Sequence, residues 1–219
     1  MPPRQSYPLA RIRILTSAVA LAMAFAIASP AHASTDDFEI VFPHDPVVTN
    51  FTSSWGDSRS GGRSHRGTDL MAPKLTPVYA IADGIVTVVR DGDRSGRWVA
   101  IDHENGWESW YMHLNNDHPG TDDGKADWSL TVASGIAEGE RVVAGELIAW
   151  VGDSGNAEPS SPHTHFELHR NGKAVDPYLH LRAAYELALE SVISELLPAV
   201  ADLVTELGSS GLRPDRPLG

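Results

Sequence analysis

Cysteine is entirely absent from this chain of 219 residues, although the chain has 10 histidines. Disulfides are therefore excluded, and stability must come from a hydrophobic core and from any metal that the folded chain binds. Zinc in proteins is held by cysteine, histidine and carboxylate side chains. A zinc site in this chain must consequently be built from histidine and carboxylate groups alone.

Positive charge is also scarce. The chain has 17 Lys and Arg residues against 29 Asp and Glu residues, which gives a formal net charge of -12 at pH 7. Proteins that bind nucleic acid carry clustered lysine and arginine side chains that neutralise phosphates. The acidic balance therefore argues against nucleic acid as a partner.

The longest apolar run, residues 14–27, is shorter than the roughly 20 residues that a membrane-spanning helix needs. Arginines precede it, and small residues follow it at Ala31 and Ala33. This order predicts a secretory signal peptide over residues 1–33 rather than an uncleaved anchor. The mature protein is then expected to be secreted, extracytoplasmic or associated with the cell wall, with no membrane span after cleavage.

The remaining sequence is long enough for one domain with short appendages. We expect a lead-in segment over residues 34–62, a main domain over 63–180, and a C-terminal amphipathic helix and tail over 181–219. Short runs of β-branched and aromatic residues, separated by turn pairs such as Asp83-Gly84, fill the main domain. Strands are predicted at 78–81, 85–89, 98–103, 107–114, 141–151 and 163–169. This pattern predicts a mainly β, antiparallel domain.

Two segments do not follow the strand pattern. Residues 115–130 contain glycine and proline breakers and several aspartates, which predicts a long acidic loop, either simply solvated or shaping a binding groove. From Leu181 onward apolar residues recur at three- and four-residue steps, which predicts a helix that Pro198 should break or kink. The apolar stripe of this helix would either pack on the β domain or bind a protein partner.

Three short histidine-containing segments can carry chemistry: His65 with Asp69, then His113, then the pair His163 and His165. Catalytic zinc uses three protein ligands and keeps one position open for water. His65, Asp69 and one histidine of the H-x-H pair would supply such a set.

Strand geometry sharpens this prediction. Residues two apart in a strand share a face, so His163, His165, Glu167 and His169 should face one way and the residues between them the core. The same rule places His113 with Ser109 and Tyr111. One face of the H-x-H strand is therefore predicted to be polar and to bind metal.

These segments resemble the lysostaphin-type (LytM-like) zinc endopeptidases, a family that hydrolyses peptidoglycan. The matching stretches are HRGTDLMAP, TPVYAIADGIV, IDHENGWESWYMHL, GERVVAGELIAWVGDSGNA and PHTHFELHRNGKAVDPY, in the family's order. The resemblance implies one Zn²⁺ per chain, held by His65, Asp69 and His165, with His113 and His163 as catalytic histidines. It also implies that the substrate is a stem peptide or cross-bridge of bacterial peptidoglycan. One departure is Leu75, where the family commonly has glycine.

Other interpretations stay open beside this one. A catalytically silent member of the same fold could bind peptidoglycan or activate another wall hydrolase. ADGIV and GERVVAGELIAWVGD also resemble the half-motifs of lipoyl and biotinyl domains, but the lysine that such carriers need between the halves is missing, so the likeness predicts only a similar barrel-like sandwich. Arg59 lies near where the family has polar residues lining the cleft, but it is expected to be an exposed structural arginine instead, and His103 is expected at the end of a hairpin.

Overall fold

The fold is described from a computed structural model, which covers residues 38–210. The signal peptide predicted for residues 1–33 lies outside these residues. Within the described part of the chain, every helix is too short or too polar to cross a bilayer.

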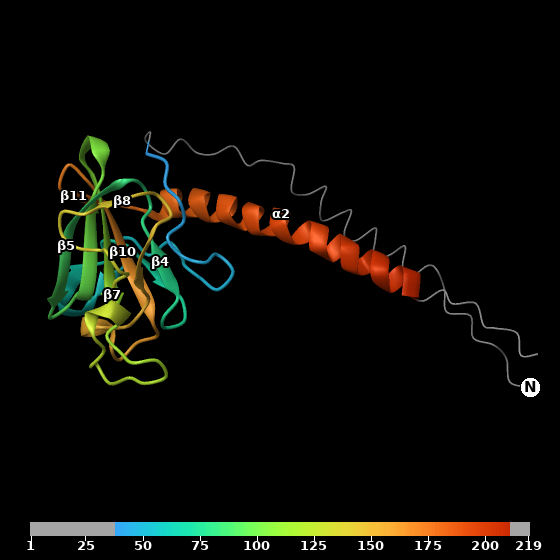
Figure 1. The fold of residues 1–219 in the computed structure, drawn as a ribbon. Coiled ribbons are helices and arrows are strands. Elements are labelled where there is room, and N and C mark those ends of the chain that lie inside the picture. The colour runs from blue at the N-terminus through green and yellow to red at the C-terminus, as the bar shows by residue number, and fades with distance from the viewer. Residues whose placement is uncertain (1–37, 211–219) are drawn as a thin grey trace, which may run out of the picture. The chain divides into compact units, whose positions relative to one another are not determined.

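A seven-stranded antiparallel sheet forms the centre of the domain (Figure 1). Its strands are β3 (Thr68–Met71), β5 (Gly84–Gly92), β6 (Gly96–Asp102), β7 (Trp107–Leu114), β8 (Arg141–Val142), β10 (His163–Arg170) and β11 (Lys173–Val175). They run in the order β11-β10-β7-β6-β5-β8. β3 pairs with the first half of β10, on the same edge on which β11 pairs with its second half. The predicted mainly β, antiparallel fold is confirmed.

Two smaller sheets complete the β structure. β4 (Pro77–Tyr79) pairs with β9 (Leu147–Trp150), and β1 (Ser58–Arg59) pairs with β2 (Arg63–Ser64). The single strand predicted over 141–151 is therefore wrong, because β8 and β9 belong to different sheets. The chain turns between them at Gly145, whose φ of 78° lies in the left-handed region that favours glycine. Leu75 has a φ of 67°, which gives a physical reason for glycine at that position in similar sequences.

The hydrophobic core fills the space between the sheets. Its largest fully buried side chains include Tyr111, Phe166 and Leu70 from the central sheet. Ile148 from β9 is equally buried. The polar side chain of Tyr111 is satisfied, because its hydroxyl accepts a hydrogen bond from the Ile81 amide at 3.0 Å. Strands β7 and β10 therefore have one face locked into the core, which leaves the other face free for a functional site.

A C-terminal helix, α2 (Tyr178–Ser210), follows the sheet. Its first turns pack on the domain, because Leu181 and Ala184 are buried and Tyr185 stacks edge-on against Phe42 and Phe51 of the lead-in segment. Pro198 lies inside the helix, so of the predicted break or kink the break is wrong.

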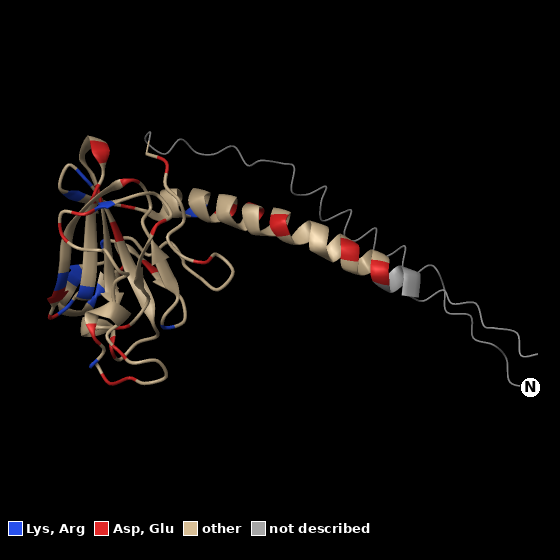
Figure 2. Cartoon of the chain, viewed as in Figure 1, with Lys and Arg blue, Asp and Glu red and all other residues tan. Residues whose placement is uncertain are grey.

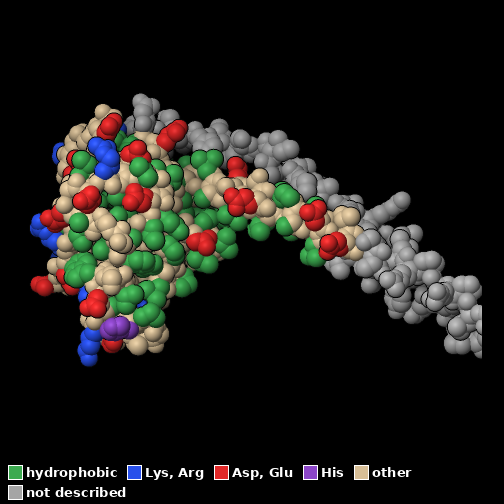
Figure 3. All heavy atoms as spheres, in the orientation of Figure 1, with side chains coloured by type: hydrophobic (Ala, Val, Ile, Leu, Met, Phe, Trp, Pro, Cys, Tyr) green, Lys and Arg blue, Asp and Glu red, His purple; other side chains and the backbone are tan. Residues whose placement is uncertain are grey.

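Farther along, large apolar side chains of α2 are exposed: Ile193, Leu196, Val200 and Leu203 by 52, 57, 46 and 56%. Figure 2 shows acidic positions along the helix, and Figure 3 shows hydrophobic side chains at its surface. The expectation that the whole apolar stripe packs on the β domain is wrong beyond the first turns.

Candidate metal centre

His65, Asp69 and His165 come together at the start of β3 and β10. Asp69 and His165 are directly opposite each other in the antiparallel ladder, and His65 lies just before β3. His65 Nε2 is 3.0 Å from Asp69 Oδ1 and 2.9 Å from His165 Nδ1, and His165 Nδ1 is 2.8 Å from Asp69 Oδ1. The three atoms therefore converge on one point, and together they could hold a metal ion.

The donor set and its dimensions fit zinc. With zinc bonds of about 2.0–2.1 Å, two ligand atoms of a tetrahedral site lie about 3.3 Å apart. The three distances observed here, 2.8 to 3.0 Å, need to open by only about half an ångström. Two imidazoles and one carboxylate are also a known catalytic zinc set, in which the fourth position takes water.

Both histidines of this group are held by a hydrogen bond at their other ring nitrogen. His65 Nδ1 donates to the Ser54 carbonyl at 2.9 Å, which leaves Nε2 for the metal. His165 Nε2 donates to Glu167 Oε1 at 3.1 Å, which leaves Nδ1 for the metal. Such outer partners fix the tautomer and the orientation of metal-binding imidazoles.

The carboxylates of the centre are held in their charged form. Although burial alone raises the pKa of Asp69, the close contacts of His165 and His65 with its carboxylate bring it well below its ordinary value. Burial likewise opposes the ionisation of Glu167, but hydrogen bonds from His165 and His169 lower its pKa to about 2. A charged Asp69 is a competent ligand, and a charged Glu167 can accept a hydrogen bond from the Nε2–H group of His165.

His113 and His163 lie beside the three converging residues. Their ring centroids are 5.1 Å apart, and His163 Nε2 is 3.9 Å from Asp69 Oδ1. His113 Nδ1 donates to the Ser154 carbonyl at 2.9 Å, and His163 Nδ1 donates to the Ser161 carbonyl at 2.8 Å. Since a carbonyl only accepts, both Nδ1 atoms carry a proton, and Nε2 is the ring nitrogen that each side chain has left for the site.

His113 reaches this place through an irregular backbone. Its neighbours Ser109 and Tyr111 are fully buried in the core, whereas Trp110 and Met112 line the groove. The sequence rule that put His113 on the face of Ser109 and Tyr111 is wrong, because His113 has a φ of 60° and lies within the register shift between β6 and β7. This left-handed residue lies among the groove-lining side chains.

The imidazole of His113 is kept neutral by its surroundings. Its exposed fraction is 7%, and burial together with the nearby His163 lowers its pKa to about 4. A neutral imidazole near pH 7 can accept a proton.

The alternation predicted for the H-x-H strand is confirmed. Thr164, Phe166 and Leu168 are fully buried, and His163, His165 and Glu167 line an open groove. The groove also receives Trp110 from β7 and His169 from β10, whose rings stack at 4.2 Å. The role of Glu167 and the Ser54 carbonyl as partners of the histidines was not identified from sequence, although the shared face of β10 was a usable signal for Glu167.

Two sequence interpretations are settled by these contacts. The view of Arg59 as an exposed structural arginine is wrong, because its Nη2 donates to Asp69 Oδ2 at 2.7 Å at the edge of the groove. Its side chain is 36% exposed. His103 does follow β6 at a hairpin end, where it is buried and bonded to the Asp83 carbonyl and to Ser109 Oγ.

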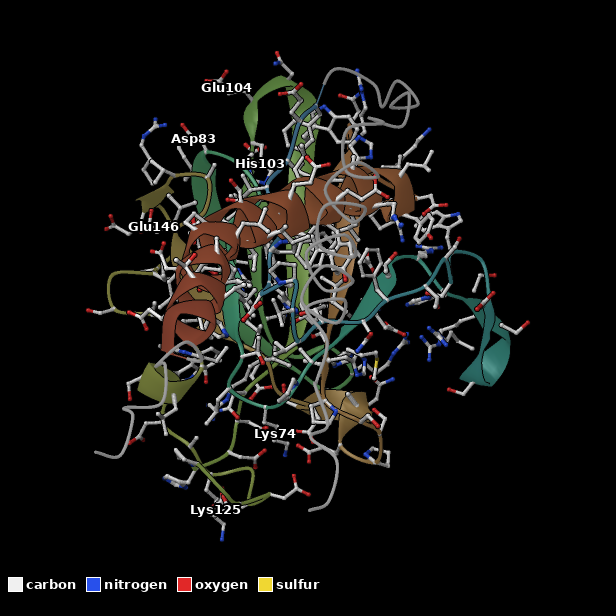
Figure 4. The ribbon with its side chains drawn as sticks, turned by 90° about the vertical axis from the view of Figure 1, so that its right-hand side faces the viewer. Lys74, Asp83, His103, Glu104, Lys125 and Glu146 are labelled. Carbon is white, nitrogen blue, oxygen red and sulfur yellow. The ribbon has the colours of Figure 1, made fainter. Side chains whose placement is uncertain are left out.

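A second group of carboxylates, Asp117, Asp122 and Asp153, is spaced closely enough to hold a cation. Lys74 already supplies one, because its Nζ lies 2.6, 2.5 and 2.9 Å from their oxygens. Although burial alone would lower the pKa of Lys74, hydrogen bonds to Asp117, Asp122 and Asp153 raise it. Figure 4 shows Lys74 near the loop that carries Lys125. Residues 115–130 contribute nothing to the groove lining, so this loop is anchored beside the site and does not shape it.

The chain is similar to known peptidases. The family model described as peptidase family M23 matches residues 63–125 and 128–177. An L-Ala--D-Glu endopeptidase of Bacillus subtilis is 33% identical over 167 residues, covering 70% of this chain and 46% of that protein. The DD-carboxypeptidase/endopeptidase Mpg of Neisseria meningitidis is 37% identical over 115 residues, covering 52% of this chain and 22% of Mpg. The chain thus spans less than half the length of these relatives.

A solved structure supports the same likeness. A zinc containing peptidase from Vibrio cholerae superposes with a TM-score of 0.51 and 27% sequence identity. The superposition covers 63% of this chain and 39% of that one.

Proposed function

This chain belongs to peptidase family M23, and from that premise we propose that it is a zinc metalloendopeptidase that hydrolyses peptide cross-links of bacterial peptidoglycan. The observation that carries the proposal is the convergence of His65, Asp69 and His165 in a groove that also contains two histidines whose Nδ1 atoms donate to backbone carbonyls. The relatives named above, an L-Ala--D-Glu endopeptidase and a DD-carboxypeptidase/endopeptidase, support peptidoglycan as the substrate.

Zinc held by His65, Asp69 and His165 would lower the pKa of a water to about 7 and polarise the scissile carbonyl. His113 and His163 would supply the proton transfers. Each presents Nε2 to the groove because its Nδ1 is bonded to a backbone carbonyl, so one ring can accept the proton of the attacking water. The protonated ring can then donate to the leaving amine, and general acid and base roles of this kind each contribute typically 100- to 10,000-fold.

Digestion of purified peptidoglycan tests the proposal. The protein is incubated with peptidoglycan alone, with a zinc chelator, and with chelator followed by zinc, and released fragments are identified by mass spectrometry. We expect cross-link-derived fragments that vanish with chelator and return with zinc. No release from a protein that binds one zinc per chain would instead favour the silent peptidoglycan-binding or activator interpretation.

We also propose that the protein is exported, since its substrate lies outside the cytoplasm. N-terminal sequencing of the protein recovered from the expressing cell's envelope or medium tests this. A mature chain that starts at Ser34 agrees with the proposal, and a chain that retains residues 1–33 in the cytoplasmic fraction contradicts it.

A protein partner for α2 is a further part of the proposal. Ile193, Leu196, Val200 and Leu203 follow the 3-4-3 spacing of a helix seam and are about half exposed. Double substitution of Leu196 and Leu203 by Asp should abolish retention of a specific envelope protein by the immobilised chain while leaving peptidoglycan cleavage unchanged. Identical retained proteins for both chains would contradict this role.

A further inference from the structure

The groove around the metal centre has the opposite charge balance to the chain as a whole. The chain has a formal net charge of -12. The groove is nevertheless lined by more basic than acidic side chains. The basic ones are Arg59, Arg63, Arg66, Arg94 and Lys173, and the acidic ones are Asp69, Glu108 and Glu167.

The acidic side chains of the groove already have partners within the fold. Asp69 is bonded to Arg59 and to the histidines of the metal centre. Glu167 lies between His165 and His169, and Glu108 accepts a hydrogen bond from Trp110 Nε1 at 3.0 Å. Asp69 and Glu167 are therefore engaged by groups of the metal centre, and Glu108 is the acidic side chain of the lining that still offers its charge.

The remaining basic side chains lack acidic partners in the described residues. Arg63 contacts only the carbonyl and hydroxyl of Ser60, at 3.1 and 3.4 Å. Arg66, Arg94 and Lys173 are exposed, and the salt bridges of the structure include none of them. Figure 2 shows basic positions gathered mainly on one side of the sheet domain.

Two of these groove-lining arginines are next to residues of the reaction centre, in two different connections of the chain. Arg66 directly follows the metal-ligand candidate His65. Arg94 precedes Ser95, whose carbonyl accepts the backbone N–H of His113 at 2.9 Å. A peptide that passes over the metal centre would therefore meet one guanidinium near the metal-ligand candidate His65 and another near His113. Arginine binds carboxylates through two parallel hydrogen bonds, and a groove strengthens the field of such charges.

We infer that the groove selects peptides that carry free carboxylates on both sides of the scissile bond, with Arg66 and Arg94 as the specificity-determining residues. This inference rests on the proposed peptidase function. It favours a direct link from D-alanine to a diamino acid with free carboxylates over a neutral glycine bridge or an amidated stem peptide.

Paired substrates test the inference. Cross-linked peptide dimers joined from D-alanine to a diamino acid are prepared with free α-carboxylates, and the same dimers are prepared with these groups amidated. A pentaglycine-bridged dimer is the neutral comparison. The ratio of kcat/KM for the free and amidated dimers is measured for the wild-type chain, Arg66→Gln, Arg94→Gln, and the control Arg90→Gln. Arg90 pairs with Glu138 and does not line the groove.

The wild-type protein and Arg90→Gln should prefer the free dimer by at least about tenfold, since charge-assisted hydrogen bonds are the strong ones. Each groove variant should reduce that ratio severalfold, and the preference should weaken as salt rises from 50 to 300 mM. Equal cleavage of free and amidated dimers by the wild-type chain would overturn the inference and leave the peptidase function standing.

A binding measurement separates the two proposals if no dimer is cleaved. Absence of cleavage of every dimer and of whole peptidoglycan would count against the proposed function. Calorimetric titration of the zinc-loaded protein with the free and amidated dimers then decides the selectivity. Tighter binding of the free dimer that Arg66→Gln and Arg94→Gln reduce supports carboxylate recognition, and equal affinities refute it.

Discussion

Replacement of Lys74 by Met should destabilise the protein more than any other single change of surface charge. Lys74 Nζ is within 2.9 Å of Asp153 Oδ2 and 2.6 Å of Asp117 Oδ2, and these carboxylate side chains are only 5% and 1% exposed. Met keeps the length and apolar stem of the side chain but removes the ammonium. Two nearly buried carboxylates would then lose their cation.

The size of the loss follows from the cost of an unpaired buried charge. Removing one partner of a buried ion pair costs about 3–5 kcal/mol. For a domain of this size, each kcal/mol corresponds to about 2–4 °C in Tm, so Lys74→Met should lower Tm by roughly 6–20 °C. Lys125→Met is the matched control, because Lys125 lies in the neighbouring loop, which Lys74 contacts through Asp117 and Asp122, and is exposed. That control should shift Tm by less than about 2 °C.

The pH dependence of the deficit gives a second, independent signature. Burial already raises the pKa of Asp153 even with Lys74 present. Without Lys74 the carboxyl groups of Asp153 and Asp117 should have pKa values above those in the unfolded chain. Carboxyl groups with a raised pKa stabilise the folded state when they are protonated and destabilise it when they are charged. The loss in free energy of unfolding caused by Lys74→Met should therefore be largest near pH 8 and should shrink toward pH 5.

Urea unfolding of the three proteins at fixed zinc concentration, at pH 8 and pH 5, measures both effects. A Lys74→Met protein within about 1 kcal/mol of Lys125→Met at pH 8 would refute the view that Lys74 neutralises buried charge. A large deficit that stays constant down to pH 5 would show that lost packing, not lost charge, is responsible.

Three further predictions concern the metal centre and acid stability. His165→Ala should lose bound zinc, whereas His113→Ala should keep zinc and lose at least about 100-fold in kcat. Zinc analysis and peptidoglycan digestion measure both effects. A fully active His113→Ala protein would contradict the assignment. Glu167→Gln should weaken zinc binding by about 10- to 100-fold, measured by chelator competition, because His165 loses its charged acceptor. Burial lowers the pKa of His44 to about 3. The His44 ring is therefore protonated more readily in the unfolded chain, and the free energy of unfolding falls as pH drops below about 6.5. Between pH 7 and 5 the free energy of unfolding of the wild type, measured by urea titration, should fall by about 2 kcal/mol more than that of His44→Asn.

The sequence was most informative where local pattern decides structure. Strands β5, β6, β7 and β10 lie close to their predicted ranges, because alternating side chains and Gly-containing turn pairs mark them locally. The alternation along β10 also assigned the polar and core faces correctly. β3 was missed because its four residues, Thr68–Met71, are too few for a clear pattern and are held as a strand by pairing with β10.

Features that depend on contacts between distant segments could not be predicted. Strand alternation put His113 on the face of Ser109 and Tyr111, and only the left-handed backbone observed at that residue reverses this. The contact of Arg59 with Asp69 joins β1 to β3, and no local pattern encodes it. The apolar stripe of α2 was visible in the sequence, but its exposure beyond the first turns was not, since burial depends on what the helix meets.

The pairing of β3 with β10 brings the metal-ligand candidates together, so binding of a metal depends on the correct alignment of these two strands. Asp69 faces His165 only in the observed register, in which His163 also faces Met71. A slip of one residue would turn Asp69 to the opposite side of the sheet, and the ligand set would be lost. Zinc would therefore bind only to chains whose strands are correctly aligned, and the zinc content of a purified sample would report the fraction of molecules that have reached the native register.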